Sequence, residues 1–254
     1  GLTSSRFSNA PYSDKTKRYY QQMNRFSANL ALLSDLAMAT LGGNLKRKER
    51  ISARLGDLLS QLYLASATLK RYEDEGRLTE DLPLVQWAVE DSLYKLQSSL
   101  DELLDNFPMG LGIGLRAVIF PFGRPLKRPS DILDHKVAKI MQTPCASRDR
   151  LGKGQFWTAS EHNAVGIQEE TFKDILASEP IYDKVCKAAG KRLPFMWLDK
   201  VAAEGKALGV LSESEIALLE RAEIGRMKSI NVDDFDPEEL KARTLEYAKQ
   251  VQAA

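Results

Sequence analysis

Two histidines and two cysteines are the side chains of this sequence best suited to nucleophilic or metal chemistry. Metal sites usually repeat such ligands at i, i+4 on a helix or in a C-x-x-C pair. Cys145 lies ten residues after His135, and neither His162 nor Cys186 has a partner at such a spacing. Folding could bring a cysteine and a histidine together as a nucleophilic pair, although no local pattern supports one. We therefore predict no metal ligand and no catalytic residue in this chain.

Two further patterns match known binding motifs only in part. Residues 110–114 read G-x-G-x-G, but a dinucleotide-binding fingerprint follows a strand, and here a helix-like stretch that ends at Phe107 comes first. The acidic run that begins at Asn231 has Asp236 and Ala242 where an EF-hand loop needs glycine and glutamate. We predict a flexible or closely packed turn at the glycines, no calcium site and no cofactor-binding residue.

The composition is that of an ordinary globular protein without electrostatic bias. The 254 residues are 43% hydrophobic and 28% charged, and 36 Lys and Arg against 35 Asp and Glu give a formal charge of +1. Such a balance gives no reason to expect nucleic acid as a partner. Residues 1–25 are polar throughout, and no stretch approaches the run of about 20 apolar residues that spans a membrane. We expect a cytoplasmic protein.

Three long amphipathic helices are predicted in the first half of the chain, after Pro11 to about residue 40, at 45–75 and at 83–106. Apolar residues recur there at steps of three and four, which places them on one helical face. Short loops between the helices predict an antiparallel bundle. The three stripes are Tyr19, Met23, Phe26, Leu30, Leu33 and Ala37; Ile51, Leu55, Leu58, Leu62, Ala65, Leu69 and Tyr72; and Val85, Val89, Leu93, Leu96, Leu100 and Leu103.

The bundle needs a fourth partner, because three stripes alone do not close a core. We expect that partner to be the short helical segment Ser130–Gln142 or something outside this chain. An intermolecular coiled coil is the alternative, since the period of about 3.5 residues also suits one. The intramolecular bundle is favoured because each run stops at a breaker.

Helical segments are shorter and breakers denser in the second half. Helices are predicted at 166–177, 180–189 and 196–208. A further helix is expected to open with a capping box, in which Ser212 and Glu215 satisfy each other's backbone N–H groups. Residues 228–241 are expected to be extended, with Ile230, Val232 and Phe235 as single apolar anchors.

These patterns predict an all-α chain: an N-terminal antiparallel helical bundle, a set of shorter helices and an extended acidic C-terminal tail. No run of alternating β-branched residues predicts a strand. The expected domains are a long-helix bundle at 1–106, an apolar and basic connector at 107–129, a short-helix region at 130–241 and a tail at 242–254.

The connector at 107–129 combines apolar side chains, several glycines and a cationic end. Its glycines disfavour a regular buried helix. An apolar loop rimmed by cations is typical of contact with a bilayer surface or with the apolar face of a partner, and a buried connector between the two halves is the alternative. The candidate contact residues are Leu111, Ile113, Leu115, Ile119, Phe120, Phe122, Arg124, Lys127 and Arg128.

Long collinear blocks of this sequence carry a family resemblance. They include Arg6-Phe-Ser-Asn-Ala-Pro, Leu41-Gly-Gly-Asn-Leu-Lys-Arg-Lys-Glu-Arg, Ser130-Asp-Ile-Leu-Asp-His and Ser229-Ile-Asn-Val-Asp-Asp-Phe-Asp-Pro. These blocks resemble the C-terminal region of the large bacterial acyl-CoA dehydrogenase of fatty-acid β-oxidation, over residues 5–241.

The resemblance implies a flavoprotein that oxidises acyl-CoA to trans-2-enoyl-CoA, with a glutamate that removes the α-proton while FAD accepts the hydride. In the family, the Val-Glu-Gly-like segment around that glutamate lies upstream of the block at Arg6, as do the flavin contacts. The nearest string here is Val89-Glu90-Asp91, which lies in a predicted helix and lacks the glycine. We therefore expect FAD in the full-length protein only, and no catalytic or flavin-binding residue in this chain.

The resemblance also implies the partners of the chain. We expect it to be a fragment, since it begins without methionine, and to pack on its own N-terminal catalytic core. Further expected partners are a second copy in a homodimer, a membrane surface on which the protein would sit peripherally at the inner membrane, and acyl-CoA through the full-length protein. The alternative is a free-standing, non-catalytic helical scaffold.

Overall fold

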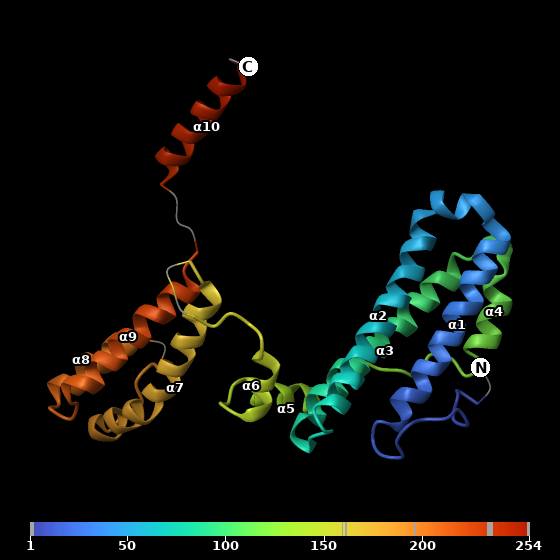
Figure 1. Cartoon of the computed structure of the whole chain (residues 1–254). Coiled ribbons are helices and arrows are strands. Elements are labelled where there is room, and N and C mark those ends of the chain that lie inside the picture. Colours follow the sequence, from blue (N-terminus) through green and yellow to red (C-terminus); the bar gives the residue numbers. More distant parts are fainter. Residues whose placement is uncertain (1–2, 159, 161, 196, 233–235, 253–254) are drawn as a thin grey trace. The chain divides into compact units, whose positions relative to one another are not determined.

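The computed structural model describes residues 3–158, 160, 162–195, 197–232 and 236–252. Within those ranges the chain forms ten α-helices and no β-strand, which confirms the all-α prediction (Figure 1). The chain divides into two compact units, Gly1–Lys153 and Gly154–Ala254. The domain boundaries after residues 106, 129 and 241 stay predictions, but the structure groups the connector with the long helices.

Three long helices make up most of the first unit: α1 (Lys17–Leu41), α2 (Glu49–Asp74) and α3 (Leu82–Asp105). Figure 1 shows them side by side and running in alternating directions, as predicted. The predicted stripes form one core, in which Phe26, Leu33, Leu58, Leu69, Leu96 and Leu100 are among the fully buried side chains. The antiparallel bundle is thus confirmed, and its core lies within one chain.

The fourth helix of the bundle is α4 (Gly112–Ile119), which lies inside the stretch expected to be irregular. Ile119 and the following Phe120 belong to the bundle core, with 1% and 6% of their areas exposed. The prediction that the segment Ser130–Gln142 supplies the fourth helix of the bundle was wrong. The helix in that segment, α5 (Asp131–Met141), has no buried residue.

Three glycines at the start of α4 have different surroundings. A Cβ added to Gly112 would lie 1.8 Å from the backbone oxygen of Leu104, so only glycine allows α4 to approach the end of α3 so closely. Gly110 has a φ of +69°, a left-handed conformation that side chains disfavour. Gly114 has no atom within 4 Å of an added Cβ. The prediction of a closely packed turn therefore holds at Gly112, and the helix forms despite the low helix propensity of glycine.

The first unit ends with two short helices. Ser130 caps α5 by accepting a hydrogen bond from the backbone N–H of Leu133 at 3.3 Å. The second, α6 (Ala146–Gly152), was not predicted from the sequence. Its seven residues give too short a pattern for a helical period to be recognised.

The second unit contains α7 (Ala164–Ala189), α8 (Leu198–Ala207), α9 (Glu213–Ile230) and α10 (Pro237–Gln252). The capping box of Ser212 and Glu215 at the start of α9 is confirmed. A single helix, α7, replaces the two predicted at 166–177 and 180–189. It continues through Pro180 because the residues beyond the proline pack in the core of this unit, which comprises Ile181, Tyr182, Val185, Leu198, Val201, Ala202, Leu219 and Ala222.

The end of the chain differs from the predicted extended tail. Helix α9 continues to Ile230, and α10 begins at Pro237, a residue type well suited to a first helical turn. Ile230 and Val232 are 58% and 85% exposed, so they do not anchor this segment to a core. The third predicted anchor, Phe235, lies outside the described residues.

Candidate functional site

Five exposed apolar side chains gather around α4, and we call them the α4 surface: Met109, Leu111, Ile113, Val118 and Phe122. Ile113 is 84% exposed and Phe122 is 74% exposed. The only charged residue within α4, Arg116, is turned toward acidic residues of α3. Exposed apolar side chains of this kind are typical of interaction sites, which makes the α4 surface a candidate site.

The structure divides the nine predicted contact residues between this surface and the core. Leu111, Ile113 and Phe122 are exposed, whereas Ile119 and Phe120 are buried and Leu115 is half-buried against the bundle. The prediction that Ile119 and Phe120 contact a membrane or partner is corrected, because they fill the bundle core. Ile119 lies four residues after Leu115, and Phe120 lies four residues after Arg116. This helical spacing could have indicated which side of the segment faces the bundle and which side faces outward.

Three cations beside the α4 surface, Arg116, Arg124 and Arg128, contact carboxylates or an aromatic ring. The Arg116 guanidinium lies 2.8 Å from the carboxylates of Asp101 and Asp105, and Arg124 also pairs with Asp101. The hydrogen bond with Asp105 raises the pKa of Arg116 above its usual value. The guanidinium of the predicted contact residue Arg128 lies 5.2 Å from the ring centre of Tyr94. Lys127 is exposed.

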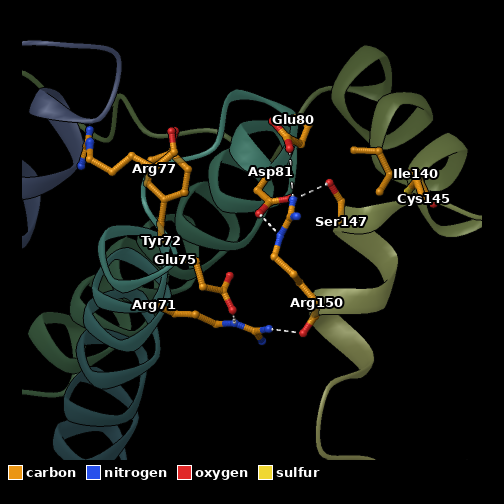
Figure 2. Close-up of polar contacts among 10 residues, drawn as sticks. All are labelled: Arg71, Tyr72, Glu75, Arg77, Glu80, Asp81, Ile140, Cys145, Ser147 and Arg150. Carbon is orange, nitrogen blue, oxygen red and sulfur yellow. Dashed lines mark hydrogen bonds and ion pairs between the residues drawn. The ribbon is translucent and has the colours of Figure 1, made fainter.

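A second polar cluster joins α6 to the turn between α2 and α3 (Figure 2). Arg150 of α6 donates hydrogen bonds to both carboxylate oxygens of Asp81, at 2.7 and 2.9 Å. The same guanidinium lies 3.4 Å from Glu80 and 3.3 Å from the hydroxyl of Ser147. Arg71 of α2 donates to the backbone oxygen of Arg150 at 2.5 Å. This cluster, which we call the α6 tie, fixes the short helix to the bundle.

The central carboxylate of the α6 tie is strongly held in its charged form. Burial of Asp81, which is 7% exposed, acts to raise its pKa, but hydrogen bonds from Arg150 and Ser147 outweigh burial and leave the pKa below its usual value. A cavity of about 170 Å³ lies beside it, with Tyr72, Leu84 and Val85 among its lining residues. Because every charged group of the tie is paired, the arrangement is suited to holding structure together.

His135 and the two cysteines form hydrogen bonds within their own segments. His135 Nδ1 lies 2.6 Å from the backbone oxygen of Asp131, and the Cys145 thiol donates to the backbone oxygen of Ile140 at 3.6 Å. Cys186 accepts a hydrogen bond from the backbone N–H of Leu193. In the part of the chain that the structure describes, no three His, Cys, Asp or Glu side chains are grouped so that they could hold a metal ion.

The sequence of the whole chain can be compared with known families. Residues 1–235 match the family model described as acyl-CoA dehydrogenase, C-terminal, bacterial type. The chain belongs to this family. The resemblance inferred from the collinear blocks is therefore confirmed. No solved structure matches the chain.

Membership of this family implies that the full-length protein uses FAD. A flavin site in this C-terminal region would need an enclosed pocket of sufficient size. The cavity beside Asp81 is smaller than the roughly 300–1,000 Å³ of most cofactor pockets. Two other hollows, of about 550 and 420 Å³, are open, one along the outside of α2 and one beside residues 6–13. None of these three hollows is the enclosed apolar slot that a flavin ring needs, so these three hollows do not fit FAD.

The string nearest to the family's glutamate motif also has a structural role. Glu90 lies within α3 and accepts a hydrogen bond from the hydroxyl of Tyr19 at 2.6 Å, which links α1 to α3. Burial and this hydrogen bond raise the pKa of Tyr19 above its usual value.

None of the helices in the described ranges is long and apolar enough to cross a bilayer.

Proposed function

We propose that this chain is the accessory C-terminal helical domain of an FAD-dependent acyl-CoA dehydrogenase of fatty-acid β-oxidation. The full-length protein oxidises acyl-CoA to trans-2-enoyl-CoA in the cytoplasm, and its catalytic glutamate and flavin site lie in an N-terminal catalytic core outside this chain. The match of residues 1–235 to the family carries the proposal. The chain packs on that core and supports the oligomerisation or membrane association of the enzyme.

Co-purification tests this role. When the 254-residue chain is produced alone, we expect no flavin absorbance and no reduction of an electron acceptor with acyl-CoA. When it is co-expressed with the upstream part of the same open reading frame, we expect both parts to purify together with bound flavin. A free-standing scaffold predicts no association between the two parts. Bound FAD on the chain alone would place a flavin site within it and would contradict the proposal.

The α4 surface is our candidate for membrane contact. Met109, Ile113 and Phe122 are each at least 74% exposed. Carboxylates pair with Arg116 and Arg124, so the apolar side chains rather than these two cations supply the attraction to the bilayer.

Co-sedimentation with vesicles of phosphatidylcholine and phosphatidylglycerol tests the membrane contact. The variant Ile113→Ser, Phe122→Ser should lose most vesicle binding and keep its melting temperature, since both side chains are exposed. The control Leu59→Ser, Tyr63→Ser removes two exposed apolar side chains from α2 and should bind as the parent does. Absence of vesicle binding by the parent at low salt, or equal losses in both variants, would exclude a specific role for the α4 surface.

A further inference from the structure

The segment before α1 and the first turns of α1 concentrate unpaired positive charge. Residues 3–34 contain five basic residues, Arg6, Lys15, Lys17, Arg18 and Arg25, and a single acidic residue, Asp14. The Asp14 carboxylate is already engaged, because it pairs with Arg77 and accepts hydrogen bonds from Thr16. Among the described residues, none of the five cations has a carboxylate partner within ion-pair distance.

A polar hollow of about 420 Å³ lies in this basic region. Its lining residues include the basic residues Arg6 and Lys17 and the polar residues Asn9, Tyr12 and Ser13. No acidic residue lines it. We call this hollow the Arg6 pocket. A concave site with two cations and several neutral donors is chemically complementary to an anion that carries several oxygen atoms.

Side chains of α1 hold the wall of the Arg6 pocket in place. The amide of Gln21 donates to the backbone oxygens of Arg6 and Ser8, at 2.8 and 3.3 Å. Asn24 donates to the backbone oxygen of Asn9 at 3.1 Å, and Arg18 donates to that of Ser4 at 2.9 Å. Since these bonds hold the backbone of residues 4–9, this wall of the pocket is ordered before a ligand binds, which lowers the entropy cost of binding.

Like charges lie close together behind the pocket. Burial lowers the pKa of Arg18, and the neighbouring charge of Arg6 lowers it further. Arg25, two helical turns beyond Arg18, is only 5% exposed, and its Nε has no hydrogen-bond partner. Its guanidinium donates instead to the backbone oxygen of Ile119 at 2.6 Å. An anion near Arg6 would relieve this repulsion, because opposite charges favour the charged form of each arginine.

We propose that the Arg6 pocket binds the phosphate group of a small organic phosphate, with Arg6 and Lys17 as its charged donors. The site lies in the chain itself and does not depend on the proposed role as an accessory domain. Phosphate fits better than a carboxylate, because it offers three or more acceptor oxygens to a pocket with both charged and neutral donors.

Titration calorimetry on the 254-residue chain at low salt tests the site, with pyrophosphate and adenosine 3′,5′-bisphosphate as probes. We expect both to bind the parent. The variant Arg6→Gln, Lys17→Gln should weaken binding by about tenfold or more, since it removes two charge-assisted contacts. The control Lys15→Gln removes one exposed cation from the same segment that does not line the pocket, and it should change the affinity less than about twofold.

The results separate the proposal from its competitors. Equal binding of both probes supports recognition of phosphate as such, and tighter binding of the nucleotide supports a site for a nucleotide phosphate. Circular dichroism measures whether the variants fold. We expect them to fold, because Arg6 and Lys17 are exposed and do not pack in the core. Failure of the parent to bind either probe, or losses as large in Lys15→Gln as in the double variant, would overturn the proposal.

Discussion

Replacement of Leu62 by alanine is expected to lower the free energy of unfolding of the first unit by about 2–5 kcal/mol. Leu62 is 8% exposed and lies in the bundle core, between Leu58 and Ala65 on the inner stripe of α2. Truncation removes the transfer free energy of the lost methyl groups and leaves a cavity that close-packed neighbours fill only in part. Urea denaturation followed by circular dichroism measures the loss.

Leu59 provides a matched control on the same helix. Its side chain is 61% exposed, so Leu59→Ala should change the free energy of unfolding by less than about 0.5 kcal/mol. Similar losses in the two variants would contradict the arrangement of α2 in the bundle. Because Leu62 packs within its own chain, the loss caused by Leu62→Ala should be the same at different protein concentrations, as it would not be if this stripe were a seam between two chains.

The second large effect is expected at the α6 tie, where Asp81→Ala should free α6 from the bundle. The substitution leaves the Arg150 guanidinium without its two strongest hydrogen bonds, and no buried apolar residue of α6 holds the helix in their place. Trypsin should then cut after Arg148, Arg150 and Lys153 about tenfold faster, because cleavage follows the population of the opened segment. The bundle itself should remain folded.

The same tie predicts a dependence on pH. The folded-state pKa of Asp81 lies below that of an unfolded aspartate, which is about 3.9. The α6 tie therefore contributes its full stabilisation to the attachment of α6 when the pH is above about 3.9. Its contribution is lost as the pH falls through the lower folded-state pKa, so α6 should become cleavable by an acid-active protease only below about pH 4.

A control for the α6 tie is Asp74→Ala at the same end of the bundle. Asp74 pairs with Lys70 one turn earlier on α2, and both side chains are at least 60% exposed. Exposed pairs of this kind contribute little, so the trypsin cleavage pattern should not change. An Asp81→Ala variant with the parental pattern would show that contacts other than the tie hold α6.

The three long helices were predictable because each carries its own complete period of apolar residues. Phe26, Leu62 and Leu96 each belong to a row of apolar residues that repeats every three or four positions over several turns. The local sequence therefore defines the buried face of each helix. The short α6 and its tie were not predictable in this way. Asp81 and Arg150 are far apart in the sequence, and only the folded chain brings their charges together.

The errors in prediction arose where packing overrides local preference. Pro180 is a helix breaker by itself, yet α7 continues because Ile181 and Val185 gain burial beyond it. The sequence of the stretch around α4 suits either a contact surface or a buried connector, and the structure divides its apolar side chains between the two, because half of them face inward. The α4 surface was nevertheless partly foreseen, since Ile113 and Phe122 are exposed.

The three glycines at the start of α4 look equivalent in the sequence, but the structure allows different substitutions at each of them. Position 114 can accept alanine, since an added Cβ there meets no atom within 4 Å. Position 110, with its φ of +69°, can accept asparagine or aspartate at moderate cost. Position 112 can accept nothing else while α4 keeps its place against Leu104. Across homologues, an invariant glycine at 112 beside a variable 114 would therefore identify the members that retain this helix pairing.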